Sequence, residues 1–403
     1  AGFGATGAAS WDTTVKTSGF TAVSGVGYFV NTTAGAISVN LPAGTAGDVV
    51  AIKDYAGTFD TNAVTLVQNG SDKIGGLTTN ATLSTEGIAV TLVFVDSTQG
   101  WLVTDDGLQS AVIQPEFITA TGGTPTTDGN FKVHTFTAPG TFTVCSTGNP
   151  AGSNEVSYMV VAGGGGGGQG TGSAPQTAGG GGAGGYREGK TPQCTYTSSP
   201  LTCTSGSNNG LPVAVASYPV VVGGGGAGQC SAARGGAGSV STFSTITSAG
   251  GGGGGDYNGG GCAGGSGGGG GAPGVPGGTG NSPPVSPAQG FNGGAGDPVG
   301  GGGGGGAAEV GEVAPGGGFG GFGGCGVATS ITGSSLGRSG GGAGGTCRNA
   351  PPSPVPFGGG TSGVPATSGG TNTGGGGGAS SPPRSPSGAG GSGIVVIRYK
   401  FQN

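Results

Sequence analysis

The chain has 403 residues, of which 109 are glycine and only 7% are charged, and its formal net charge is −5. An ordinary globular domain contains about 7% glycine and about 25% charged residues. The chain has 12 Lys and Arg residues and no basic stripe, which argues against a nucleic-acid-binding protein that neutralises phosphates. No apolar run reaches the roughly 18 residues of a membrane-spanning helix, so we expect no membrane insertion.

Glycine is concentrated in one part of the chain. Residues 1–162 contain 22 glycines, and the other 87 lie in residues 163–393. The first boundary is abrupt, because the apolar run EVSYMVVA leads directly into the six glycines 163–168. At the second boundary, GSG gives way to IVVIRYKF. The sequence therefore predicts a β-rich front, a glycine-rich body and a C-terminal strand.

Residues 1–110 have the pattern of short strands. Apolar and polar positions alternate in GYFVNT, AISVNLP, DVVAIKDY, AVTLVQNG, IAVTLVFVD and GWLVTDD. Turn signals such as Asn69-Gly70 separate these runs. We expect a small all-β sandwich or barrel that acts as an attachment module, with the apolar run 90–95 as its central strand.

Residues 111–162 are predicted to form a β-hairpin connector that leads into the glycine-rich body. The segment HTFTAPGTFTV (134–144) has two β-type runs around Ala138-Pro139-Gly140, which is a turn sequence. Essentially no α-helix is expected anywhere in the chain.

The glycine-rich body, residues 163–393, allows several interpretations. Collagen is excluded because glycine does not recur at every third residue. A dinucleotide-binding loop is excluded because GxGxxG matches arise by chance in polyglycine and no strand–helix context accompanies them. A flexible linker and a packed bundle of polyglycine II helices remain.

Energetics and run length favour the polyglycine II bundle over the linker. Ordering the backbone costs about 1–2 kcal/mol per residue, and isolated glycine runs should stay disordered. Extended threefold helices without side chains can pack closely and exchange backbone hydrogen bonds, each worth about 0.5–1.5 kcal/mol. Many runs of similar length suit such a lattice. The strands 156–162 and 394–403 bracket the region, and we expect them to pair.

The sequence offers little catalytic chemistry. His134 is the only histidine, and we interpret it as a β-strand residue rather than a general base. No CxxC pair and no cluster of histidines indicates a metal site, and no cofactor is expected. Asp54 and Asp60 lie near each other in KDYAGTFDTN and could touch a cation, although the EF-hand spacing is absent. We therefore expect a protein that is not an enzyme.

Cysteines and loop residues give the remaining candidates. Cys194 and Cys203 flank a short loop and are the best candidates for a disulfide among seven cysteines. Alternatively, some of these cysteines are small apolar core residues.

Binding specificity must come from the loops between the glycine runs, since glycine offers only backbone groups. Aromatic and charged residues in these loops are the candidate contacts with a binding partner, namely Tyr186, Arg187, Lys190, Tyr196, Tyr257, Phe291, Arg348, Phe357 and Arg384.

Proline-rich loops are predicted to form the recognition surface. The segments 281–291, 349–357 and 380–386 are rich in proline, which fixes φ and reduces the entropy that a loop loses on binding. We expect these three loops to lie together on one exposed end of the bundle. The segment 186–212, within an insertion at 186–219, is the alternative surface.

Several segments together resemble a known family. VSYMVVAGGGGGG, YPVVVGGGGAG, STFSTITSAGGGGGG and GGSGIVVIRYKF are similar to the glycine-rich domains of phage tail-fibre and adhesin proteins, and the front module resembles modules of phage virion structural proteins. The resemblance implies a polyglycine II sandwich whose loops contact a bacterial surface glycan or outer-membrane protein. It also implies a place in the virion beside other fibre proteins and is compatible with a homo-oligomer such as a trimer. An architectural role without receptor binding is the alternative: a capsid fibre, a decoration protein or a secreted cell-surface filament.

Overall fold

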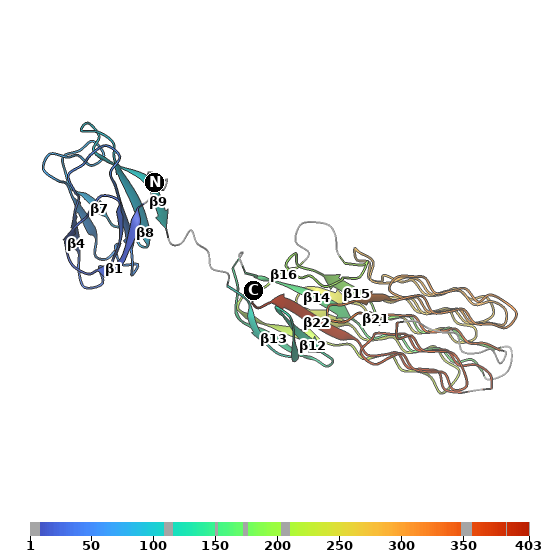
Figure 1. Cartoon of the computed structure of the whole chain (residues 1–403). Coiled ribbons are helices and arrows are strands. Elements are labelled where there is room, and N and C mark those ends of the chain that lie inside the picture. The colour runs from blue at the N-terminus through green and yellow to red at the C-terminus, as the bar shows by residue number, and fades with distance from the viewer. Residues whose placement is uncertain are drawn as a thin grey trace. The chain divides into compact units, whose positions relative to one another are not determined.

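The chain folds into two compact units, Ala1–Gln114 and Pro115–Asn403, in a computed structural model (Figure 1). The structure describes residues 9–108, 116–149, 152–171, 176–202, 210–347, 357–383 and 385–402. Throughout these ranges the regular elements are β-strands and no α-helix occurs, which confirms the all-β prediction. The same ranges contain no helix that is long and apolar enough to cross a bilayer.

Nine strands build the described part of the first unit, residues 9–108. They are β1 (Ser10–Lys16), β2 (Phe20–Thr21), β3 (Val26–Val30), β4 (Ile37–Asn40), β5 (Val49–Asp54), β6 (Val64–Val67), β7 (Ala81–Leu83), β8 (Ile88–Phe94) and β9 (Trp101–Leu108). One sheet has the order β1-β3-β5-β8-β9 and the other β2-β4-β6-β7. From β1 to β6 the chain alternates between the sheets, so neighbouring strands there are parallel.

The core of this unit lies between the two sheets. Alternate side chains of each strand point inward, and Val39, Ile52, Leu66 and Trp101 are almost fully buried there. The prediction that residues 90–95 form the central strand is wrong. β5 is central in its sheet, and β8 lies between β5 and β9, because β8 is followed by a hairpin to β9 that adds one more strand at the edge.

The second unit contains two larger sheets. One has the order β10 (Thr119–Thr121), β13 (Gly140–Ser146), β17 (Ala216–Val221), β18 (Ser241–Phe243) and β19 (Ile246–Ser248). The other has the order β11 (Thr124–Asp128), β12 (Phe131–Phe136), β22 (Ile394–Lys400), β14 (Glu155–Val161) and β15 (Tyr186–Gly189), with β16 (Leu211–Pro212) paired to β14. A further hairpin joins β20 (Val327–Thr329) to β21 (Leu336–Arg338).

The hairpin predicted over residues 134–144 is not formed. β12 and β13 belong to different sheets, because Phe136 and Phe142 both turn into the core between these sheets and the segment between them crosses over. The hairpin that does form joins β11 to β12. Residues 116–149 therefore contribute strands to the same compact unit as the glycine-rich body and do not form a separate connector.

β14 and β22 pair antiparallel, from Val161 opposite Ile394 to Ser157 opposite Arg398. Both strands are almost entirely buried, in keeping with their mostly apolar sequences. The entry to the glycine-rich body and its exit therefore lie side by side at this sheet.

Hydrogen bonds join the glycine runs with a period of three residues. In the run 163–168, the first and fourth amides donate to carbonyls of residues 236–239, the second and fifth to 388–391, and the third and sixth to 179–182. Each neighbouring run is therefore contacted by every third residue, which is the periodicity of an extended helix with three residues per turn.

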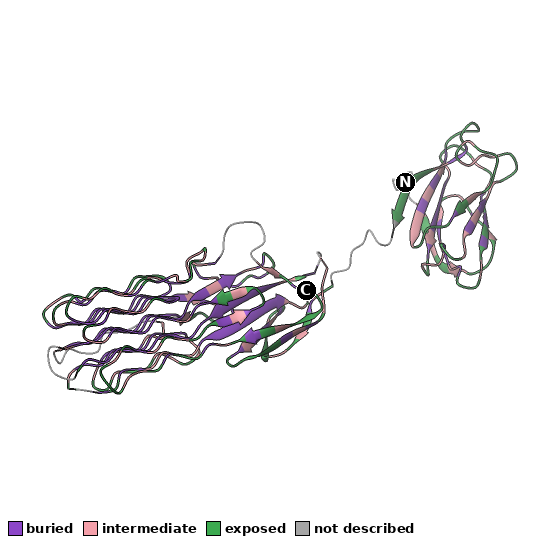
Figure 2. Ribbon diagram, turned by 180° about the vertical axis from the view of Figure 1, so that it is seen from behind, coloured by how far each residue is buried: buried purple, intermediate pink, exposed green. Residues whose placement is uncertain are grey.

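The runs are packed too closely for side chains. Cβ atoms added to Gly164, Gly167 or Gly181 would overlap carbonyl groups of neighbouring runs. The inner runs are buried along their length, as Figure 2 shows in purple. Glycine is therefore required there for its lack of a side chain.

The runs lead away from the sheets and return to them (Figure 1). Because the run 163–168 starts directly after β14, its last residues mark the end of the bundle remote from the sheets. We call this the distal end, and the end beside the sheets the proximal end.

Candidate functional site

Loops from widely separated parts of the sequence meet at the distal end. The amide of Ser380 donates to the carbonyl of Gly168 at 3.2 Å, and Nε2 of Gln169 donates to the carbonyl of Ser385 at 2.8 Å. Gln229 and Ser387 are joined by two hydrogen bonds of 2.8 and 3.0 Å. Three loops that are far apart in the chain are thus held as one surface.

Further hydrogen bonds extend this surface across the bundle. The amide of Gly274 donates to the carbonyl of Asp297 at 3.0 Å, and Thr177 Oγ1 donates to the carbonyl of Val299 at 3.2 Å. The amide of Cys347 donates to the carbonyl of Gly318 at 3.0 Å. We define the distal face as the described loop residues 169–171, 229–234, 256–258, 272–276, 297–300, 316–318, 363–366, 380–383 and 385–386.

The distal face is rich in small and polar residues and has few charges. Arg234 and Asn258 are exposed, and Asp256 and Asp297 are half-buried. One carboxylate oxygen of Asp297 is already hydrogen-bonded within its own loop, since Oδ1 accepts from the backbone amides of Val299 and Gly300. Across the described ranges no group of His, Cys, Asp or Glu side chains is arranged to hold a metal ion. The face is therefore suited to binding through shape and hydrogen bonds.

Tyr257 is the described candidate contact that lies on the distal face, where it is half-buried. Phe291 and Phe357 are half-buried at the proximal end; Phe291 follows the loop that contacts β15, and the carbonyl of Phe357 accepts from Gly340, just after β21. Arg348 and Arg384 lie outside the described residues.

The structure corrects the prediction that Tyr186 and Tyr196 contact a receptor. Their exposed fractions are 1% and 6%, because both rings pack in a core cluster with Met159 and Ile394. The Tyr186 hydroxyl donates to Glu188 Oε2 at 2.8 Å, and burial raises the pKa of Tyr186 well above its ordinary value. These tyrosines anchor the insertion that follows β15 and cannot reach a ligand.

Arg187 and Lys190 belong to the same proximal region. Both are half-buried, and Lys190 Nζ lies 5.2 Å from the centre of the Tyr196 ring. A cation over an aromatic face stabilises this arrangement. Lys190 thus covers the anchored tyrosine and lies far from the distal face.

The prediction that three proline-rich loops share one end is also wrong. Residues 281–290 are proximal, because the carbonyl of Gln289 accepts from Tyr186 at 2.9 Å and its side chain accepts from Ala249 at 2.8 Å. Residues 380–383 and 385–386 are distal. Residues 349–356 lie outside the described residues.

Two further candidates occupy buried positions. Cys194 is buried, while Cys203 lies outside the described residues, so their pairing stays a prediction. His134 is buried in β12, with Nδ1 2.7 Å from the carbonyl oxygen of Gly122 and Nε2 3.1 Å from the hydroxyl of Tyr399. Both ring nitrogens are thus committed to contacts within the fold.

Asp54 serves as a loop anchor. Its buried carboxylate accepts hydrogen bonds from backbone amides on two loops of the first unit. Asp60, the other residue suggested for cation contact, is exposed.

Sequence analysis missed the polar residues that organise the distal face. Gln169 and Gln229 each follow a glycine run directly, and Ser385 and Ser387 precede the last one. A polar side chain at the end of a polyglycine run can bond across to the next loop. The location of these residues at the ends of glycine runs is the feature of the sequence that could have identified them.

Comparison with known proteins agrees with this architecture. The model of a family described as a glycine-rich domain matches residues 136–400. No curated protein matches the chain. The match covers most of the second unit, from the strands before the first glycine run to β22, and the chain belongs to this glycine-rich domain family.

Proposed function

We propose that this chain is a non-enzymatic recognition subunit of a phage tail fibre, and that its distal face binds a surface glycan or an outer-membrane protein of the bacterial host. The observation that carries the proposal is the gathering of many loops on one face at the end of a bundle of glycine runs. This arrangement suits a protein whose variable loops are displayed while the frame stays fixed.

We further propose that the glycine runs are polyglycine II helices. The three-residue period of their hydrogen bonds and the absence of space for a Cβ support this assignment. A frame of this kind holds both ends of each distal loop. Rigid loops lose less conformational entropy on binding, which favours affinity.

The first unit is proposed to attach the chain to other fibre proteins of the virion. It forms a separate compact unit with its own core, which is what a module with a separate task requires. Assembly as a homo-oligomer, for example a trimer, would multiply weak contacts between distal faces and the cell surface.

An exchange of loops tests the receptor-binding role. The loops 229–234, 256–258 and 363–366 of the full chain are replaced by those of a relative with another host, and adsorption to both hosts is measured. We expect the binding pattern to follow the distal loops. The matched control replaces the proximal loop 281–290 and should leave the binding pattern unchanged. A folded distal chimera that keeps its original pattern contradicts the proposal.

An architectural role has one observation in its favour. Val310, Val313, Phe319 and Phe322 are all about half-exposed and repeat at a spacing of three on two adjacent runs. The amide of Glu312 bonds to the carbonyl of Phe322 at 3.0 Å, so the two runs lie side by side. A row of exposed apolar side chains favours lateral association. If this role holds, the purified chain forms polymers in sedimentation experiments, and the double variant Phe319→Ser, Phe322→Ser does not.

A further inference from the structure

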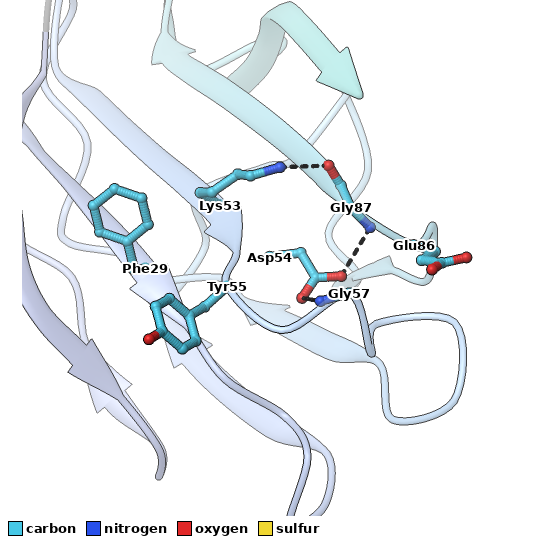
Figure 3. Close-up of a pocket in the computed structure, with 7 residues that line it drawn as sticks. All are labelled: Phe29, Lys53, Asp54, Tyr55, Gly57, Glu86 and Gly87. Carbon is cyan, nitrogen blue, oxygen red and sulfur yellow. Dashed lines mark hydrogen bonds between the residues drawn. The ribbon is translucent and has the colours of Figure 1, made fainter. Parts of the chain in front are cut away.

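The first unit contains a cavity of about 650 Å³ that has no part in the proposed function. Its walls come from Phe29 on β3, from Lys53 and Asp54 at the end of β5, from Tyr55 and Gly57 in the following loop, and from Glu86 and Gly87 before β8 (Figure 3). Ligand sites typically have volumes of about 300–1,000 Å³. The cavity is thus large enough for a small ligand.

A single buried carboxylate holds two walls of the cavity together. Asp54 is 3% exposed, and its oxygens accept from the amides of Gly57 at 3.0 Å, Phe59 at 3.2 Å and Gly87 at 2.9 Å. Lys53 Nζ donates to the carbonyl of Gly87 at 2.5 Å. The loops on both sides are therefore fixed before a ligand arrives, which lowers the entropic cost of binding.

Aromatic rings line one side of the cavity. Phe29 is half-buried, and Tyr55 is 57% exposed and lies beside it (Figure 3). The Trp11 ring packs against Phe29, with the two ring centres 4.9 Å apart. An exposed tyrosine next to a supported phenylalanine offers an apolar surface with a polar edge.

Polar groups complete the cavity. Glu86 is exposed and lies on the side opposite the aromatic rings (Figure 3). Lys53 has three N–H donors, and one of them is used by Gly87. The nearby charges are one ammonium and two carboxylates, and the Asp54 carboxylate is occupied by backbone amides. The excess of negative charge disfavours phosphates and acidic sugars.

We infer that this cavity binds a neutral saccharide unit. The C–H face of a sugar ring packs on Tyr55 and Phe29, and its hydroxyl groups donate to Glu86 and accept from Lys53. This combination of an aromatic platform with a carboxylate and an ammonium group on the other walls fits a ligand that has one apolar face and many hydroxyl groups. The inference concerns the first unit, so it stands independently of recognition by the distal face.

The test uses the full chain on an array of neutral, amino and acidic oligosaccharides. We expect the wild-type chain to bind at least one neutral saccharide. Tyr55→Ala and Glu86→Gln should each weaken this binding about tenfold or more, as is usual when an anchoring contact is removed. Leu77→Ala is the matched control, because Leu77 is 64% exposed in the same unit and does not line the cavity. It should bind like the wild type.

Tryptophan fluorescence checks that the variants fold, since both tryptophans, Trp11 and Trp101, lie in the first unit. The inference is overturned if the chain binds no neutral saccharide, if it binds acidic glycans alone, or if binding survives both Tyr55→Ala and Glu86→Gln. Replacing the distal loops leaves this binding unchanged, which separates it from the proposed receptor contact.

Discussion

His134 Nε2 lies 3.1 Å from the hydroxyl oxygen of Tyr399, across the pair of strands β12 and β22. Nδ1 of the same ring lies 2.7 Å from the carbonyl oxygen of Gly122, which can only accept a hydrogen bond. The proton of neutral His134 is therefore on Nδ1, and Nε2 accepts from Tyr399. Burial disfavours a second proton on this ring.

Stability of the second unit should fall at mildly acidic pH. Burial lowers the pKa of His134 below its ordinary value of 6.5, so the unfolded chain binds a proton at a higher pH than the folded chain. The contribution of neutral His134 to the free energy of unfolding is therefore fully present above about pH 6.5. It decreases as the pH falls towards the pKa of His134 in the folded chain. The single histidine gives one imidazole signal in NMR. We expect it to titrate below 6.5 in the folded chain and near 6.5 in urea; equal midpoints contradict the prediction.

Glycine should be indispensable inside the bundle and replaceable at its surface. A Cβ on Gly303 would overlap the carbonyl of Phe322, whereas one on Gly224 would meet nothing within 4 Å. We expect Gly303→Ala to lower the free energy of unfolding by about 2–4 kcal/mol, through overpacking and displaced hydrogen bonds. Gly224→Ala should change it by less than about 0.5 kcal/mol. Urea unfolding followed by circular dichroism measures both, and similar shifts would indicate a loose linker.

Glu188 should stabilise the insertion that follows β15. Its carboxylate is 3% exposed and accepts from Tyr186 Oη at 2.8 Å, from the amide of Ser199 at 2.9 Å and from Thr329 Oγ1 at 2.7 Å. Glu188→Gln replaces one acceptor oxygen by a donor and should cost about 2–3 kcal/mol. Glu116→Gln, at an exposed site of the same unit, is the control and should be nearly neutral. Equal unfolding midpoints for the two variants would rule out this role.

Glu309 should slow the alkylation of the Cys325 thiol. Hydrogen bonding to Glu309 and, to a smaller extent, burial raise the pKa of Cys325. Because the thiolate is the reactive form, alkylation of Cys325 by iodoacetamide at pH 8 should be faster in Glu309→Gln than in the wild type. The rate at the exposed Cys230, measured by mass spectrometry in the same sample, should not change. An unchanged Cys325 rate would contradict the prediction.

Strands with strong local signals could be predicted from the sequence. The runs 156–161 and 394–400 are mostly apolar, and each forms a buried strand in the same sheet. The glycine runs predicted close backbone packing, because backbones without side chains can approach one another until their amide and carbonyl groups pair. In these segments the local sequence pattern matches the burial and packing that the segment has in the folded chain.

The placement of the loops could not be predicted in the same way. The runs do not simply alternate in direction: the amides of Gly340 and Ala343 donate to the carbonyls of Phe357 and Gly360, so these two successive runs are parallel. Where two successive runs are parallel, the loops that follow lie at the opposite end of the bundle from the end that strict alternation of the runs would give. Polyglycine has no side-chain pattern that reveals its direction. The burial of Tyr186 and Tyr196 was hidden for a related reason, since their partners come from β14 and β22.

The backbone lattice has a consequence for how such a chain can evolve. Because the inner runs are joined through amide and carbonyl groups, their pairing does not depend on which residues occupy the distal loops. A loop can therefore lengthen, shorten or change its residues without a compensating substitution in the runs. An inner glycine, by contrast, can hardly change at all. We expect mutation to diversify one face of the molecule rapidly while the body beneath it stays almost constant.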